Sequence, residues 1–279
     1  MGLFFQKLLA IDRRWIFILL GLVVVVPTYH PLNLPGLKAS PNVRAVYDTI
    51  ENLPEGSKIL VSFDYDPASM PELAPQATAV LTHCFRKKHK VVAMGLWVTG
   101  VAMAKESLNT TSKEAKAVYG EDWVYLGWKP GSVAVIAAMG SDIHNCFPKD
   151  AAGADVGSLK LMQRVKKLSD FDLVVSFAAG SPGIDTWIAY GSDKYKFKIT
   201  GGTTAVNVPS MAQYVQSGQM IGLIGAMRGG AEYELLVKKP GDATAGMDAI
   251  SLAHYLIVLL IIIGNIAFFI SRKRKGAAS

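Results

Sequence analysis

The feature that most constrains this chain is an uncharged stretch near its C-terminus, from Ala249 to Ile270. These 22 residues would span roughly 33 Å as an α-helix, enough to cross a hydrocarbon core of about 30 Å. Within it, Leu256 to Ile263 is apolar on every face, and the basic run from Arg272 to Lys275 follows the stretch, which fits a buried core helix poorly. His254 and Tyr255 lie near one end, where amphipathic rings are expected at a membrane interface. We therefore predict a transmembrane helix over 249–270.

A second apolar segment lies near the N-terminus. It runs from Trp15 to Val26 and is closed by Pro27. A basic start followed by a short apolar stretch also fits a cleaved secretory signal peptide. No small-x-small cleavage site follows the valines, so we expect an uncleaved signal anchor that forms a transmembrane helix over 15–31.

The charges that flank the two segments indicate an orientation. Lys7, Arg13 and Arg14 precede the first segment, and the basic run from Arg272 to Lys275 follows the second. Positive residues are retained on the cytoplasmic side of a membrane. We expect an integral protein of the cell membrane with both termini in the cytoplasm and the intervening domain outside it.

The distribution of charge argues against a nucleic-acid partner. The chain has 29 basic and 22 acidic residues, a net charge of +7. Residues 1–29 carry +2 and the tail carries +4, which leaves 22 basic and 21 acidic residues, or +1, in between. A nucleic-acid surface needs basic residues concentrated on the folded domain. The hydrophobic fraction of 51% also excludes a disordered chain.

Between the two apolar segments, helical and strand-like patterns alternate. Ser40 and Pro41 start a helix that ends at Pro54 to Gly56. We predict strands over 58–63, 91–98, 133–138, 172–177 and 196–200, an edge strand over 232–238, and helices over 69–88, 101–118, 158–168 and 208–228. Nearly uniform apolar strands that alternate with helices predict an α/β fold with an open, mostly parallel, Rossmann-like or flavodoxin-like sheet flanked by helices.

The expected organisation follows from these patterns. It comprises a cytoplasmic N-terminus over 1–14, the first transmembrane helix over 15–31, a Pro-rich linker and helix over 32–57, an extracytoplasmic α/β domain over 58–248, the second transmembrane helix over 249–270 and a basic cytoplasmic tail over 271–279.

Ligands of open parallel sheets bind beyond the carboxyl ends of the strands. Polar or small residues follow four of the expected strands at this edge. One of these segments, Gly-Ser-Pro-Gly, could expose N–H groups to an anion. In the alternative interpretation it only forms a tight turn. The candidate ligand-binding residues are Asp64, Asp66, Thr99, Ser141, Gly180, Ser181 and Gly183.

Asp64 and Asp66 follow the first predicted strand with one residue between them. This Asp-x-Asp pattern resembles the nucleophile motif of haloacid-dehalogenase-type phosphatases. The resemblance implies that Asp64 attacks phosphorus, that Asp66 is the general acid and base beside Mg²⁺, and that Thr99 is the second-strand hydroxyl. The chain departs from the family later, because its late strand ends in Ala-Ala-Gly-Ser-Pro-Gly and not in a Lys and an acidic pair. In the alternative interpretation, Asp66 shapes the strand-to-helix turn and Asp64 accepts backbone N–H groups.

Two cysteines, Cys84 and Cys146, lie in the expected external domain. Outside the cytoplasm they could form one disulfide, or they could be separate core thiols. With the neighbouring histidines they also form a conceivable metal set, but their spacing is not that of paired zinc ligands. We expect no bound metal and no cofactor.

Four glycines in the last predicted helix of the domain fall on one helical face: Gly218, Gly222, Gly225 and Gly229. Such a stripe would permit close packing against the sheet of the domain itself or against a helix of another subunit. Asn265, a polar side chain within the C-terminal apolar segment, could hydrogen-bond to a neighbouring membrane helix, or it could face the lipid headgroups near the basic end.

These observations favour a structural or accessory subunit of a membrane protein assembly. Its expected partners are the lipid bilayer and either further copies of the chain or other membrane proteins. A small-ligand-binding external domain is the first alternative, and a metal-dependent phosphatase that uses Asp64 and Asp66 is the second. The sequence shows no complete catalytic set.

Overall fold

The computed structural model describes residues 12–276, with side chains to residue 270. The chain divides into two compact units, one comprising residues 36–243 and the other the two ends of the chain, up to Pro35 and from Thr244. Most of the predicted cytoplasmic N-terminus, residues 1–11, lies outside the described residues, as does the end of the basic tail.

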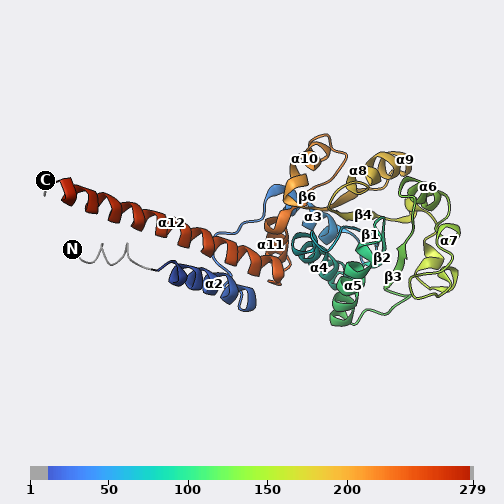
Figure 1. Cartoon of the computed structure of the whole chain (residues 1–279). Coiled ribbons are helices and arrows are strands. Elements are labelled where there is room, and N and C mark those ends of the chain that lie inside the picture. The colour runs from blue at the N-terminus through green and yellow to red at the C-terminus, as the bar shows by residue number, and fades with distance from the viewer. Residues whose placement is uncertain (1–11, 277–279) are drawn as a thin grey trace. The chain divides into compact units, whose positions relative to one another are not determined.

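The larger unit is built on one six-stranded parallel sheet (Figure 1). Its strands are β1 (Lys58–Asp64), β2 (Lys90–Gly95), β3 (Trp123–Trp128), β4 (Leu173–Ala178), β5 (Ile199–Thr203) and β6 (Leu223–Gly225). Their order in the sheet is β3-β2-β1-β4-β5-β6. This is the order of a doubly wound Rossmann sheet and not that of a flavodoxin. The predicted α/β class with a parallel sheet is confirmed.

Helices cover both faces of this sheet, as the labels in Figure 1 show. One face carries α3 (Pro41–Asn52), α4 (Met70–Arg86), α5 (Gly100–Ala115) and α11 (Ala226–Leu236). The other carries α6 (Val133–Ser141), α7 (Ile143–Cys146), α8 (Ile184–Trp187), α10 (Val208–Gln216) and the one-turn helices η1 (Val156–Ser158), η2 (Met162–Arg164) and η3 (Leu168–Asp170). The short elements η4 (Ile188–Ser192), α9 (Asp193–Tyr195) and η5 (Ala205–Asn207) complete the unit.

The pattern of β1 shows why the sheet lies in the middle. Ile59, Val61 and Phe63 enter the core on one face, whereas Leu60 enters the core on the other. A strand that is buried on both faces is mostly apolar, and this one is apolar from Ile59 to Val61 before it reaches Ser62 and Asp64. The crossovers after β1 and β2 lie on the first face and those after β3 and β4 on the second, so β1 and β4 flank the point where the winding reverses.

The third strand is not where the sequence predicts it. Residues 133–138 belong to helix α6, which buries Val135, Ile136 and Met139 and leaves the residues between them exposed. This is a helical repeat, and a short apolar run is ambiguous between strand and helix. The true third strand is β3, Trp123–Trp128, which lies at the edge of the sheet and contains the aromatic residues that are enriched in strands.

The last third of the unit also differs from the prediction. The expected helix over 158–168 is a series of separate turns, η1 to η3. The expected helix over 208–228 is interrupted, because α10 ends at Gln216 and β6 forms before α11 starts at Ala226. The expected edge strand over 232–238 lies mostly within α11. Gly218, with a φ of 76°, lies in the left-handed region that breaks the helix.

The smaller unit contains the helices α2 (Arg13–Tyr29) and α12 (Asp242–Gly276), the latter of which starts in the larger unit. In α12, Asp242–Ile270 contains an 18-residue window with a mean hydropathy of 2.4 and is long and apolar enough to cross a membrane. It is the one such helix among the described residues, since α2 comprises 17 residues there. The C-terminal apolar helix is thus confirmed, and the N-terminal span remains a prediction.

Candidate functional site

The carboxyl edge of the sheet gathers most of the predicted ligand-binding residues around the reversal point between β1 and β4. Asp64 ends β1, Thr99 precedes α5, and residues 180–183 follow β4. Ser141 is not part of this group by position, because the segment before it is helix α6 and not a strand. The geometry of each group decides what this edge can bind.

The Asp64 carboxylate is enclosed and satisfied by the protein. Its Oδ1 accepts the backbone N–H of Leu96 at 2.6 Å. Its Oδ2 accepts the hydroxyl of Ser62 at 2.7 Å and that of Ser176 at 3.3 Å. The side chain is fully buried, and this burial raises the pKa of Asp64 to about 7. The carboxylate therefore joins β1, β2 and β4 at the reversal point and has no exposed atom with which to attack a substrate.

Asp66 has a different and local role. Its Oδ1 accepts both the backbone N–H and the hydroxyl of Ser69, at 2.9 and 2.8 Å. These hydrogen bonds lower the pKa of Asp66 and close the turn that leads into α4. Thr99 donates its hydroxyl to the carbonyl of Tyr65 at 3.2 Å, which secures the same loop. Asp66 and Thr99 therefore shape the strand-to-helix turn, and Asp64 accepts a backbone N–H group, as in the alternative interpretation. This is not the geometry of a phosphatase site.

The loop after β4 is tied to the segment that follows β2. The indole Nε1 of Trp97 donates to the carbonyl of Pro182 at 2.7 Å. The N–H of Gly183 is directed to Asp185 and Thr186 of its own chain, at 3.2 and 3.3 Å. An N–H that already has partners is not available to an anion. Trp97 and the loop after β4 are therefore hydrogen-bonded to each other at this edge of the sheet.

The two cysteines lie on opposite faces of the sheet. Cys84 belongs to the core under α4 and Cys146 to the core under α7, and both thiols are free and buried. Of the two possibilities that the sequence left open, a disulfide or separate core thiols, the structure shows separate core thiols. Burial raises the pKa of Cys84 to about 12, so this thiol stays protonated.

The histidines near these cysteines are used within the fold. His83 lies between Tyr233 and Glu51, and the Nε2 of His144 contacts the carbonyls of Met162 and Val165. In the part of the chain that the structure describes, no group of three His, Cys, Asp or Glu side chains is placed to hold a metal ion.

The glycine stripe is not a single surface. Gly218 lies in the turn after α10, Gly222 precedes β6, Gly225 ends it, and Gly229 lies in α11. An added Cβ at Gly222 would collide with the backbone carbonyl of Asn42 in α3. The helical face on which the predicted interaction depends is therefore absent. Asn265 lies in α12 with its side chain exposed.

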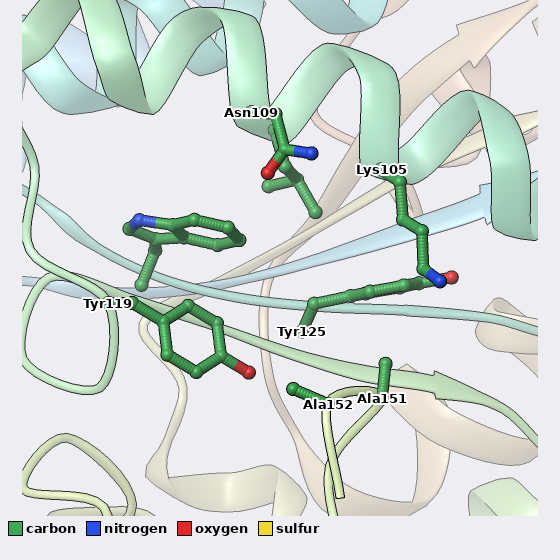
Figure 2. Close-up of a pocket in the computed structure, with 8 residues that line it drawn as sticks. Lys105, Asn109, Tyr119, Tyr125, Ala151 and Ala152 are labelled. Carbon is green, nitrogen blue, oxygen red and sulfur yellow. The ribbon is translucent and has the colours of Figure 1, made fainter.

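Sequence reasoning missed a pocket of about 480 Å³ between α5 and the edge strand β3 (Figure 2). Three aromatic residues line it, Tyr119, Trp123 and Tyr125, and the other lining residues are Lys105, Leu108, Asn109, Ala151 and Ala152. The sequence does carry a signal, because Lys105 and Asn109 are four residues apart on a helix and Trp123 and Tyr125 alternate on a strand. Because the third strand was predicted over 133–138, residues 123–128 were not recognised as the strand that faces this helix.

Asp150 accepts hydrogen bonds from several groups that form one wall of this pocket. Its Oδ2 accepts the hydroxyl of Tyr119 at 2.5 Å, and its Oδ1 accepts the N–H groups of Ala152 and Ala154 at 2.8 and 2.9 Å. Burial and this carboxylate raise the pKa of Tyr119. The Tyr119 ring and the 150–154 loop are thus held as one wall.

Comparison of the chain with protein-family models, with curated proteins and with solved structures gives no match.

Proposed function

We propose that this chain is an integral membrane protein anchored by two helices, α12 and α2, with its α/β domain outside the cytoplasm, and that it serves as an accessory subunit of a membrane protein assembly. The basic residues before α2 and after the apolar part of α12 support a cytoplasmic position for both ends. The bilayer is then one partner, and further subunits are the other.

A hydrogen-bonded clamp supports the second anchor. Asp248, in α12, is 4% exposed, and its carboxylate accepts the backbone N–H groups of Leu32, Asn33 and Leu34 at 2.8, 2.8 and 3.1 Å. These residues closely follow α2, so the clamp ties the exit of α2 to α12. Helix α2 would be roughly 25 Å long, and large apolar side chains such as Trp15 and Phe17 lie exposed on it. Exposed apolar surface of this kind is stable in lipid.

Two glutamates of helix α11 bind residues near the two ends of the α/β unit. Glu232 accepts the N–H of Ser40 at 2.9 Å, at the start of the domain. Glu234 accepts the N–H groups of Gly241 and Ala243 at 2.9 and 3.0 Å, at its end. The chain therefore enters and leaves the domain beside the same helix, so both connections can reach one membrane face.

The position of Asn265 is the observation that best supports a role as an accessory subunit. Its side chain is exposed on α12, seven residues before Arg272, which places it roughly 10 Å inside the apolar span. An amide that faces lipid without a partner is unfavourable, and a hydrogen bond to a neighbouring helix stabilises it. Gly264, beside it, has open space around its Cβ position, so another helix can approach closely there.

The test compares Asn265→Leu with Ser251→Leu, which removes a polar side chain elsewhere on the same helix. Gentle detergent extraction followed by native mass spectrometry should show the wild-type chain in assemblies larger than a monomer. Asn265→Leu should shift the population toward monomer, because the interhelical hydrogen bond contributes about 1 kcal/mol, and Ser251→Leu should not. A wild-type chain that is monomeric and carries no partner would contradict the proposal.

A further inference from the structure

The pocket beside β3 has no part in the anchoring role and resembles a small-molecule site. Its volume of about 480 Å³ lies within the range of about 300–1,000 Å³ that is usual for ligand pockets. Such pockets are mostly apolar and contain a few polar groups that orient the ligand. Here the polar groups come from α5 and β3, the two regular elements that border the pocket.

The aromatic rings give the pocket flat apolar walls. The rings of Tyr119 and Trp123 meet edge to face, with centroids 4.7 Å apart and an interplanar angle of 85°. Tyr125 contributes a third ring, and Figure 2 shows it extending beneath α5. Leu108 adds an aliphatic surface from the helix. Walls of this kind favour a planar ligand, which gains ring contact without ordering many bonds.

Two buried hydrogen-bond donors of these rings have no partner among the residues that the structure describes. They are the indole Nε1 of Trp123, which is 9% exposed, and the phenol hydroxyl of Tyr125, which is 4% exposed. Burial raises the pKa of Tyr125 to about 12, so its hydroxyl remains a donor at neutral pH. Buried donors without partners are rare because they are costly, and a ligand that brings an acceptor recovers that cost.

The charge at the pocket is positive. Lys105 forms no ion pair among the described residues. The nearby Asp150 is engaged by Tyr119 and by the loop N–H groups. In Figure 2 the amine of Lys105 and the hydroxyl of Tyr125 lie toward the same end of the pocket. An aromatic cage for a cation would not place a lysine there, because like charges repel.

We propose that this pocket binds a small planar organic acid, an aromatic ring system that carries a carboxylate. The ring lies among Tyr119, Trp123 and Tyr125, and the carboxylate is directed to Lys105. Asn109, four residues after Lys105 on the same helix, offers an amide to a further polar group of the ligand. The binding site lies away from the loops at the carboxyl edge of β1 and β4 where the sequence predicts one.

Naphthoate is the probe that tests this proposal, with naphthamide as its uncharged analogue and a naphthyl trimethylammonium ion as the cationic one. Equilibrium dialysis with the full-length protein in detergent should show saturable binding of naphthoate, with weaker binding of the amide and weakest binding of the cation. Partition into micelles is not saturable and is measured with empty detergent. An absence of saturable naphthoate binding at millimolar concentration, or a preference for the cation, overturns the proposal.

Exposed positions give variants that leave the core intact. Lys105→Met should lower the affinity for naphthoate about tenfold, the loss expected when a charge-assisted hydrogen bond is removed, and should change that for naphthamide little. Lys113→Met, on the same helix but outside the pocket, should bind as the wild type does. Ala152→Trp should fill the pocket and abolish binding of both probes. Equal effects of Lys105→Met and Lys113→Met, or undiminished binding by Ala152→Trp, would show that the ligand lies elsewhere.

Discussion

A carboxylate that is closed off from water changes how the fold responds to pH. Asp64 has a pKa of about 7 in the folded protein, because burial disfavours the charged form more than its three hydrogen bonds favour it. In the unfolded chain its pKa is near the ordinary value of 3.8. The folded state therefore holds a proton that the unfolded state has lost between these two pH values. The contribution of Asp64 to stability is complete below about pH 4 and is lost as the pH rises through 7.

Asp64→Asn tests this dependence, because an amide keeps the shape and does not titrate. The free energy of unfolding of the variant, relative to the wild type, should rise by up to about 4 kcal/mol between pH 4 and pH 8. Thermal unfolding followed by tryptophan fluorescence at several pH values measures it. Asp66→Asn is the control, since the pKa of Asp66 is lowered and that variant should lose stability relative to the wild type above pH 4. A pH-independent difference for Asp64→Asn would contradict the account.

Helices α3, α4 and α11 are connected by a buried polar chain. His83 in α4 lies 2.8 Å from the hydroxyl of Tyr233 in α11 and 2.7 Å from the carboxylate of Glu51 in α3. Burial lowers the pKa of His83 to about 4, and the hydrogen bond from His83 lowers the pKa of Glu51 to about 2. At neutral pH the imidazole is thus uncharged, donates from Nε2 to Glu51 and accepts at Nδ1 from Tyr233.

Tyr233→Phe should destabilise the fold by about 1–3 kcal/mol, because it leaves the Nδ1 of His83 buried without a donor. Tyr47→Phe is the matched control, since it keeps the ring that stacks on His83 at a centroid distance of 4.5 Å. Thermal melts of both variants at pH 7 give the comparison. Equal effects of the two substitutions would show that the hydrogen-bonded chain contributes nothing specific.

Gly222→Ala tests the packing of β6 against α3. The added methyl group would meet the backbone carbonyl of Asn42, so one of the two elements must move, and we expect a loss of about 1–3 kcal/mol. Gly157→Ala, whose methyl group would lie 3.3 Å from a carboxylate oxygen of Asp155, should cost less. Chemical denaturation distinguishes the two. A Gly222→Ala variant as stable as the wild type would show that this glycine is not required for packing.

The alternation of apolar runs and helical patterns was sufficient to predict a parallel α/β sheet, because strands buried on both faces are almost uniformly apolar. It failed where an element is short. Val133–Ser141 is as apolar as a strand, yet it forms a helix that buries one side only. Which of the two structures forms depends on the surface against which the segment packs. Gly218, Gly222 and Gly225 have a helical spacing by coincidence, since each meets a separate requirement of a turn or a close approach.

The site was predictable only in part. That Asp64 and the loop after β4 lie at one edge follows from the rule for parallel sheets. That Trp97 donates a hydrogen bond to Pro182 there depends on the orientation of one side chain, which no local pattern encodes. The pocket beside β3 depends on the edge strand and on a loop 25 residues later in the chain, so it appears only when the tertiary fold is known.

At the scale of the whole molecule, the globular unit and the apolar unit have different stabilising contacts. The α/β unit is stabilised by two cores, one on each face of the sheet. The other unit exposes its apolar side chains, and within it the carboxylate of Asp248 in α12 accepts the N–H groups of Leu32 and Asn33. Large exposed apolar surfaces are stable in lipid and unfavourable in water, so the smaller unit is expected to lie in the membrane.

Accessibility labelling in intact cells determines on which side of the membrane the domain lies. Cys84 and Cys146 are buried, so a membrane-impermeant maleimide should not label the folded wild-type chain. The Ser217→Cys variant carries a thiol at an exposed position of the domain, and the Ser279→Cys variant carries one at the end of the chain. The account predicts labelling of Ser217→Cys in intact cells and of Ser279→Cys only after the membrane is permeabilised. Labelling of Ser217→Cys only after permeabilisation would place the domain in the cytoplasm and contradict it.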